Sequence, residues 1–208
     1  CFAQSGWFWQ NPLPTENSTQ DITSVDGHIF IATDNCGLFK STDQGISWEQ
    51  GNCPSYNHYE SIHFLNSQTG YACGNYTLVK TTDGGHNWNS ISTIYNGFVK
   101  ASFLNTNTGF TVDYNGTLYL TLNSGQTWTT INTEGVRIRD FIAFDMNNIV
   151  CAGVLTGTAR ILRTSNGGIN WMMYSGIAGS ELNSILFADS NTGFAGGYFQ
   201  SNNLYILK

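Results

Sequence analysis

The sequence predicts an all-β fold, a β-propeller whose blades are four-stranded antiparallel sheets. A short motif, Ser/Thr-x-Asp/Asn-x-Gly-x-x-Trp, occurs four times, at residues 41–48, 81–88, 121–128 and 164–171. Successive copies start 40, 40 and 43 residues apart. The 208 residues include 23 Gly, and only 11% are charged, as expected for short strands joined by many turns. Repeats of about 40 residues, each with its own turn chemistry, indicate propeller blades.

Each residue type in the motif suits a tight hairpin loop that hydrogen-bonds to itself. Gly at the fifth position allows positive φ, and Asp or Asn at the third accepts hydrogen bonds from nearby backbone N–H groups. The hydroxyl adds a local bond, and the Trp covers the hairpin with its apolar face. Because Asn replaces Asp in two copies, we interpret the motif as structural and not catalytic. Its residues are Ser41, Asp43, Gly45, Trp48, Thr81, Asp83, Gly85, Trp88, Thr121, Asn123, Gly125, Trp128, Thr164, Asn166, Gly168 and Trp171.

Short apolar runs separated by Gly, Asn and Asp turns predict the strands between these motifs. The expected first three strands of each blade are 21–25, 28–33 and 38–40, then 61–64, 71–74 and 77–80, then 101–104, 110–112 and 117–120, then 140–144, 148–153 and 160–163, and finally 182–187, 194–196 and 204–208. A fourth strand begins at each motif Trp. The blades therefore span about 21–51, 60–91, 99–131, 139–174 and 181–208, within one domain of residues 5–208.

Residues 7–11 form an additional expected strand before the first blade. Trp9 precedes Trp48 by 39 residues, which keeps the period of the motif. This strand would complete the last blade and close a ring of five blades, removing the open sheet edges. The alternative is that the chain is a fragment of a ring of six to eight blades. The sequence leaves both interpretations open.

The four motifs resemble the Asp-box, or BNR, repeat, and the resemblance covers nearly all of the chain. That family includes sialidases, some endoglucanases, sortilin-type receptors and Ycf48-type photosystem II assembly factors. The chain looks most like Asp-box proteins exported by Bacteroidetes. The resemblance implies that the boxes lie on the hairpins between third and fourth strands, and that ligands bind at the opposite face, formed by the loops between blades and between second and third strands.

Charge, hydropathy and cysteine content limit the expected cellular location of the protein and the classes of partner it can have. A net charge of −6 disfavours nucleic acid, and no apolar run reaches the roughly 18 residues of a membrane helix. We interpret residues 1–4 as a signal-peptide remnant, which predicts a secreted or cell-surface bacterial protein, extracellular or periplasmic. The protein is expected to be a monomer. No C-x-x-C pair exists, so no metal site and no cofactor are expected. Cys73 and Cys151 are expected to be buried, and whether Cys36 and Cys53 form a disulfide stays open.

Aromatic and amide side chains are concentrated in the loops expected at the ligand face. Stacking surfaces beside hydrogen-bonding amides suit a glycan or an extended protein segment. The candidate ligand-binding residues are Tyr56, His58, Tyr59, Tyr76, Tyr95, Phe98, Asp113, Tyr114, Asn115, Tyr198 and Phe199. We therefore predict a non-enzymatic exported propeller that binds a glycan or a protein.

Two alternatives remain beside this hypothesis. The first is a glycoside hydrolase of the sialidase or endoglucanase type. It would have to use a carboxylate pair such as Asp113 and Asp140, because the three converging arginines and the Arg-Ile-Pro motif of sialidases are not found. The second is an assembly factor of the Ycf48 type. Those factors use an arginine patch, and this chain has a smaller group of Arg137, Arg139, Arg160 and Arg163.

Overall fold

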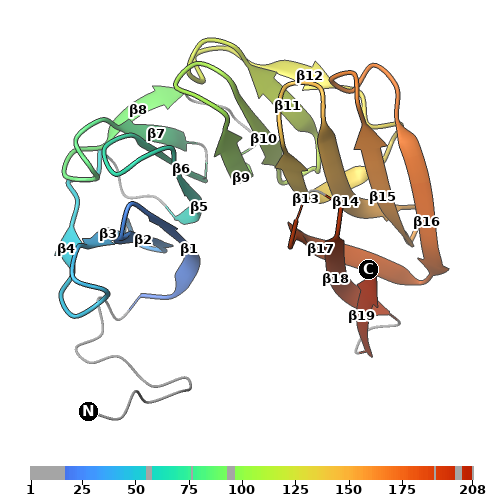
Figure 1. Ribbon diagram of the computed structural model, residues 1–208, viewed down its shortest axis with the longest axis horizontal. Coiled ribbons are helices and arrows are strands. Elements are labelled where there is room, and N and C mark those ends of the chain that lie inside the picture. Colours follow the sequence, from blue (N-terminus) through green and yellow to red (C-terminus); the bar gives the residue numbers. More distant parts are fainter. Residues whose placement is uncertain are drawn as a thin grey trace.

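The computed structural model describes residues 17–54, 58–75, 77–92, 97–189, 191–199 and 203–207, with only the backbone of 92 and 203–207. These residues form five antiparallel sheets that follow one another around an arc (Figure 1). The first strand of each sheet lies on the inner side of the arc, and these inner strands contact one another in sequence. Nothing in these segments is a helix long and apolar enough to cross a membrane.

The sheets are built from strands that are consecutive in the chain, as expected for propeller blades. Sheet 1 contains β1 (Thr19–Val25), β2 (His28–Thr33), β3 (Leu38–Ser41) and β4 (Glu49–Gln50). Sheet 2 contains β5 (Tyr59–Phe64), β6 (Gly70–Gly74), β7 (Thr77–Thr81) and β8 (Asn89–Ser92). Sheet 3 contains β9 (Phe98–Phe103), β10 (Gly109–Asp113), β11 (Leu118–Thr121) and β12 (Thr129–Ile131). Sheet 4 contains β13 (Arg137–Ala143), β14 (Ile149–Leu155), β15 (Thr158–Thr164) and β16 (Met172–Ala178). Sheet 5 contains β17 (Ser180–Phe187), β18 (Gly193–Phe199) and β19 (Asn203–Leu207).

The expected propeller architecture is confirmed, with one strand per sequence run and a box on each β-hairpin between third and fourth strands. In the described residues the fifth sheet has three strands, and the first and fifth sheets lie at the two ends of the arc (Figure 1). The segment 7–11, expected to complete the fifth blade, lies outside the described residues. Closure of a five-bladed ring therefore stays a prediction.

The core consists of four apolar clusters, one between each pair of successive sheets. The first joins sheets 1 and 2 through Phe30 and Phe64, whose rings stack with centroids 3.5 Å apart. The second joins sheets 2 and 3 through Tyr71 and Phe103, which stack in the same way. The third and fourth clusters join sheets 3 and 4 and sheets 4 and 5. Burial between sheets, and not within one sheet, therefore holds the arc together.

A Phe–Gly pair recurs where the first and second strands of a sheet meet. The cross-strand partners are Phe64 and Gly70 in sheet 2, Phe103 and Gly109 in sheet 3, and Phe187 and Gly193 in sheet 5. A Cβ atom on Gly109 would lie 2.5 Å from the Phe103 ring. Sheet 4 has the inverse pair, Ala143 opposite Ile149. The small and the large residue have exchanged strands, which fills the space from the other side.

This exchange predicts strong coupling between the two positions in sheet 3. Gly109→Ile alone should cost about 1–3 kcal/mol, because the new side chain overlaps the Phe103 ring. Phe103→Ala together with Gly109→Ile reproduces the pair found in sheet 4, and should cost less than the sum of the two single changes. Urea denaturation of a double-mutant cycle measures the difference. Additive costs would contradict complementary packing.

Carboxylates on the inner strands connect neighbouring sheets. Asp21 Oδ2 accepts a hydrogen bond from the N–H of Ile62 in sheet 2, at 2.9 Å. Asp140 Oδ2 accepts one from the N–H of Ile185 in sheet 5, at 2.8 Å. Each Asp follows a β-bulge, where the first strand has one residue more than its partner. The bulge places the carboxylate against the next sheet, so a local irregularity in one blade fixes the position of another.

The cysteines divide into one bonded pair and two buried thiols. Cys36, in the turn between β2 and β3, and Cys53, after β4, form a disulfide with a Cα–Cα distance of 6.2 Å. Both pack against the first core cluster. Cys73 and Cys151 are free and fully buried, and burial raises the pKa of the Cys73 thiol well above its usual value. These two thiols behave as small apolar core residues.

Candidate functional site

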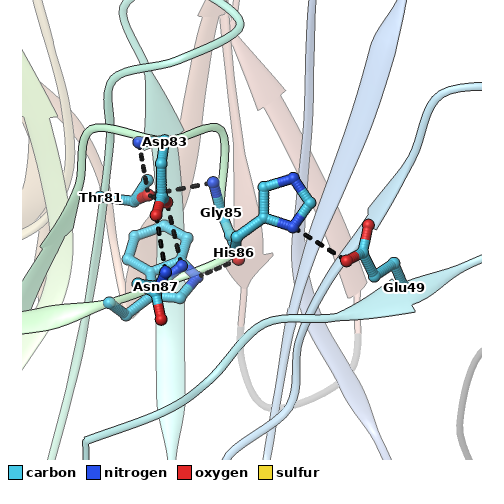
Figure 2. Close-up of polar contacts among 7 residues, drawn as sticks. Glu49, Thr81, Asp83, Gly85, His86 and Asn87 are labelled. Atoms are coloured by element: carbon cyan, nitrogen blue, oxygen red, sulfur yellow. Dashed lines mark hydrogen bonds and ion pairs between the residues drawn. The ribbon is translucent and has the colours of Figure 1, made fainter.

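The four Asp-boxes form the turns at one end of the sheets, and their polar groups are engaged within the turn. In the second box, shown in Figure 2, Thr81 Oγ1 donates to Asp83 Oδ1 at 2.8 Å and accepts from the N–H of Gly85 at 3.0 Å. The Asn87 N–H and side-chain amide donate to the two oxygens of Asp83. His86 Nδ1 lies 2.8 Å from Glu49 Oε1 of the preceding sheet. The Asp83 carboxylate therefore organises the hairpin.

The other three boxes repeat the hydroxyl and third-position contacts. The glycine N–H donates to the hydroxyl in every box, and the third residue accepts from the N–H four positions later. Two consecutive residues have positive φ in each box, where the sequence analysis expected only the fifth-position Gly. Gln44 and Ser124 occupy the fourth position in the first and third boxes, with φ of 61° and 62°. Nothing in the motif pattern singled out this position.

The hydrogen bonds within the boxes stabilise the ionised form of the two aspartates. The Ser47 hydroxyl and backbone N–H lower the pKa of Asp43 to about 2, from 3.8. The backbone and side-chain N–H groups of Asn87 do the same for Asp83, whose pKa is also about 2. A folded-state pKa below the unfolded value contributes stability above pH 3.8, and this contribution is lost as the pH falls through about 2.

Replacing both aspartates by Asn should therefore weaken the pH dependence of stability between about pH 4 and 2. The third and fourth boxes already have Asn123 and Asn166 at this position with the same backbone contacts. The variant Asp43→Asn/Asp83→Asn should unfold with a smaller difference between pH 4 and pH 2, measured by urea denaturation at each pH. The matched control Asn123→Asp should enlarge that difference. If neither variant changes the difference in stability between pH 4 and pH 2, the low pKa values of Asp43 and Asp83 are not the source of the pH dependence.

The opposite end of the sheets, here called the loop face, contains the loops between blades and between second and third strands. A hydrogen-bond network crosses this face from sheet 2 to sheet 4. Tyr114 Oη lies 2.8 Å from Glu60 Oε1 of β5 and 2.8 Å from Asn75 Oδ1 in the turn after β6. Arg137 of sheet 4 donates to the backbone oxygen of Tyr114 at 2.8 Å. His58 Nε2 lies 3.1 Å from Glu60 Oε1.

A second group continues the polar surface from sheet 4 to sheet 5. Arg139 forms an ion pair with Glu181, and Tyr198 donates its hydroxyl to the same carboxylate. Burial alone would raise the pKa of Glu181, but the hydrogen bonds from Tyr198 and Arg139 outweigh it and hold the pKa below its usual value. The hydrogen bond to Glu181 raises the pKa of the Tyr198 hydroxyl. Both groups therefore keep their ordinary charge states near neutral pH.

β-bulges explain why these charged side chains lie at the face. Glu60 and Arg139 are the extra residues of the bulges in β5 and β13, without a cross-strand partner. A groove of about 450 Å³ runs between sheets 3 and 4. Its lining is rich in amides and hydroxyls: Asn115, Gly116, Thr117, Thr130, Ile131, Asn132, Thr133, Gly135, Val136 and Arg137. Arg137 thus connects the groove with the network around Tyr114.

The residues predicted to bind a ligand fall into three groups. Tyr56, Tyr76 and Tyr95 lie outside the described residues. His58, Tyr114, Asn115, Tyr198 and Phe199 belong to the loop-face segments, and Tyr114 and Tyr198 are 38% and 41% exposed.

The third group is buried in the core instead of exposed at the face. Tyr59 packs between sheets 1 and 2, with its hydroxyl 3.2 Å from Cys53 Sγ. Phe98 packs between sheets 2 and 3 against Trp128. Both begin the inner strands β5 and β9, so their rings lie in the cores between sheets.

Asp113 is also buried, at 1% exposed, and accepts hydrogen bonds from Thr117 N–H and Tyr119 Oη. Sequence reasoning missed Glu60 and Glu181, which only the bulges and the blade order bring to the face.

The carboxylates considered for glycoside hydrolysis have structural contacts. Asp113 organises the loop before β11, and Asp140 contacts Lys100 Nζ and the N–H groups of Phe141 and Ile185. No three His, Cys, Asp or Glu side chains of the described segments gather closely enough to hold a metal ion. The loop face is thus equipped for hydrogen bonding and ion pairing.

The chain resembles known proteins in sequence family and in fold. The family model of the photosynthesis system II assembly factor YCF48 matches residues 2–136. No curated protein sequence matches significantly. A structure of YCF48 bound to D1 peptide superposes with a TM-score of 0.72 at 18% identity, covering 94% of this chain and 66% of that one. YCF48 from Cyanidioschyzon merolae gives 0.67 at 17% identity, covering 91% and 69%. An ancestral GH74 enzyme gives 0.73 at 18% identity, covering 97% and 31%.

Two consequences follow from these similarities. The chain spans less than two thirds of the YCF48 chain with the D1 peptide and less than one third of the GH74 enzyme, and at these identities the structural likeness concerns the fold alone. The predicted location at the surface or outside of a bacterial cell is wrong, because the matching family is that of a photosystem II assembly factor. Residues 1–4, which suggested export, lie outside the described residues.

Proposed function

The chain belongs to the photosystem II assembly factor YCF48 family, and on that premise we propose that it binds an extended segment of another protein at its loop face. The YCF48 structure with a bound D1 peptide is the precedent for such a ligand. The observation that carries the proposal is the presence of two polar groups on this face, Tyr114 with Glu60 and Arg137 across sheets 2 to 4, and Glu181 with Arg139 and Tyr198 across sheets 4 and 5.

The chemistry of the groove beside Arg137 supports a peptide ligand. Arg137 is exposed and forms no ion pair with any carboxylate of the described residues, so its guanidinium is available to an acidic side chain or a chain terminus. The hydroxyls and amides around it can pair with the backbone of an extended segment. Arg139, in contrast, forms an ion pair with Glu181, so its charge is already neutralised by a carboxylate of the chain. A guanidinium without a carboxylate partner among the described residues, beside neutral hydrogen-bonding groups, favours a weakly acidic peptide.

Binding of the D1 peptide tests the proposal directly. Isothermal titration calorimetry with the whole chain should give a saturable signal. Arg137→Gln should weaken binding about ten- to a hundredfold, because a hydrogen bond to a charged group is worth about 1.5–3 kcal/mol. Lys80→Gln, on β7, removes the same charge elsewhere and is the matched control. No binding to the peptide, or equal loss in both variants, would contradict the proposal, as would selective binding on a glycan array with none to the peptide.

A further inference from the structure

We propose that the loop face has a second charged subsite, at Glu60, which binds a basic side chain of the same protein segment whose acidic group Arg137 binds. This inference rests on the proposed function and narrows it to segments that carry both charges. Glu60 is the extra residue of the β-bulge in β5, and its side chain is 23% exposed. The bulge leaves Glu60 without a cross-strand partner, so its carboxylate is available at the loop face.

One carboxylate oxygen of Glu60 has partners, and the other has none among the described residues. Oε1 lies 2.8 Å from Tyr114 Oη and 3.1 Å from His58 Nε2. Oε2 accepts no hydrogen bond from the described part of the chain. Because both oxygens of a carboxylate carry lone pairs, Oε2 can accept from a further donor.

No Lys or Arg of the described segments forms an ion pair with Glu60. The two that form ion pairs there, Lys100 and Arg139, have other carboxylates as partners. His58 is charged only when protonated. The sequence outside the described segments includes one Lys, Lys208, and no Arg. A partly buried carboxylate is screened less by water and salt than a fully exposed one, so a cation from a ligand is bound more strongly there.

Glu181 shows the arrangement of a similar carboxylate for which the chain supplies the cation. Glu181 accepts the Tyr198 hydroxyl, as Glu60 accepts the hydroxyl of Tyr114, and it also pairs with Arg139. The main difference between the two glutamates is therefore the guanidinium, which Glu60 lacks. A Lys or Arg side chain of a bound segment supplies such a cation to Glu60.

Tyr114 sets the spacing between the two charged subsites, because it contacts both. Its hydroxyl is bonded to Glu60, and its backbone oxygen accepts a hydrogen bond from Arg137. The carboxylate and the guanidinium are therefore separated by the length of one tyrosine, which corresponds to roughly two to four residues of an extended chain. The expected ligand class is a segment with a basic and an acidic residue at this spacing.

Short peptides with a neutral frame of Ser, Ala and Gln test the subsite by isothermal titration calorimetry with the whole chain. The first peptide has Lys and Glu about three residues apart. Two others have Gln in place of either the Lys or the Glu, and the last has Gln in place of both. At pH 8, where histidine side chains are ordinarily neutral, the Lys/Glu peptide should bind most tightly. Replacing its Lys by Gln should weaken binding about tenfold, because hydrogen bonds between charged groups are strong.

Glu60→Gln should remove the difference between the Lys/Glu peptide and its Lys-to-Gln version, and should keep the preference for Glu, which depends on Arg137. The amide oxygen of Gln can still accept the Tyr114 hydroxyl, so the variant should stay folded, which urea denaturation checks. Glu49→Gln is the matched control, because Glu49 is an exposed carboxylate beside His86 at the box end. This control should keep the difference between the two peptides.

Three results would overturn the proposal: equal affinity for the Lys/Glu peptide and its Lys-to-Gln version, no binding of any of these peptides, or the same effect of Glu49→Gln and Glu60→Gln. Titration of the D1 peptide under the same conditions separates this proposal from the proposed function. If the chain binds the D1 peptide and shows no preference for Lys, the proposed function stands and the Glu60 subsite does not. Binding of the Lys/Glu peptide that depends on Glu60, without binding of the D1 peptide, supports the subsite and removes the D1 peptide as a ligand.

Discussion

Trp88→Ala is expected to lower the free energy of unfolding by about 3–5 kcal/mol, the usual cost of truncating a buried Trp. Trp88 is 4% exposed and belongs to the cluster between sheets 1 and 2. Its indole packs edge to face on Phe64, and its Nε1–H donates to the backbone oxygen of Gly85 at 3.0 Å. Truncation therefore removes apolar contacts between two blades and one hydrogen bond within the box.

Urea denaturation followed by far-UV circular dichroism measures this cost. Trp48→Ala is the matched control, because Trp48 makes the same bond to its own box, Nε1–H to Gly45 O, but is only half-buried and belongs to no core cluster. Its loss should cost clearly less. Equal costs in the two variants would contradict the view that a box Trp stabilises mainly the contact with the preceding blade.

Asp140→Ala is expected to cost about 3 kcal/mol, because it leaves several groups without their partner. Asp140 contacts Lys100 Nζ of sheet 3 and the N–H groups of Phe141 and Ile185. The two backbone donors become buried and unpaired. Lys100, whose side chain is 34% exposed, can turn to water, so the cost should stay below that of breaking a fully buried pair.

The equivalent change at Asp21 separates the two contributions. Asp21 accepts from the N–H groups of Ile22 and Ile62, the same backbone arrangement as Asp140, with no lysine bonded to it in the described residues. Asp21→Ala should therefore cost about 1–2 kcal/mol in the same denaturation experiment. A cost at Asp140 no larger than that at Asp21 would mean that the Lys100 pair contributes nothing to stability.

The repeat made most of the fold predictable from the sequence. The motif spacing placed four hairpins, and the apolar runs between them placed the strands, because each blade repeats the same local chemistry. The packing between blades was harder to predict from the sequence. Tyr59 and Phe98 were expected at the ligand face and lie in the core. Each is the first residue of a strand, and a shift of one residue in the expected strand start separates an exposed loop position from a buried strand position. The exchange of Phe and Gly for Ala143 and Ile149 also became visible only with the register in hand.

The candidate site was harder to predict for a physical reason. The contacts at the loop face join residues of different sheets, Glu60 with Tyr114, Tyr114 with Arg137, and Arg139 with Glu181, so the partners are far apart in the sequence. Glu60 and Arg139 reach the face through bulges, which a pattern of alternating residues does not reveal. The sequence analysis named Tyr114 and the arginines as candidate residues, but it could not identify the side chains and backbone groups that they contact. A local motif predicts a hairpin well, but a surface made by several blades depends on how the blades are arranged.

Hydrogen–deuterium exchange of the whole chain, with and without the D1 peptide, tests the central claim most directly. If the loop face binds an extended protein segment, the peptide should slow exchange in residues 113–119 and 132–139, around Tyr114 and Arg137. The box hairpins at residues 41–48 and 81–88, at the opposite end, should exchange at the same rate in both samples. Unchanged exchange at the loop face in the presence of saturating peptide, or protection confined to the boxes, would contradict the account.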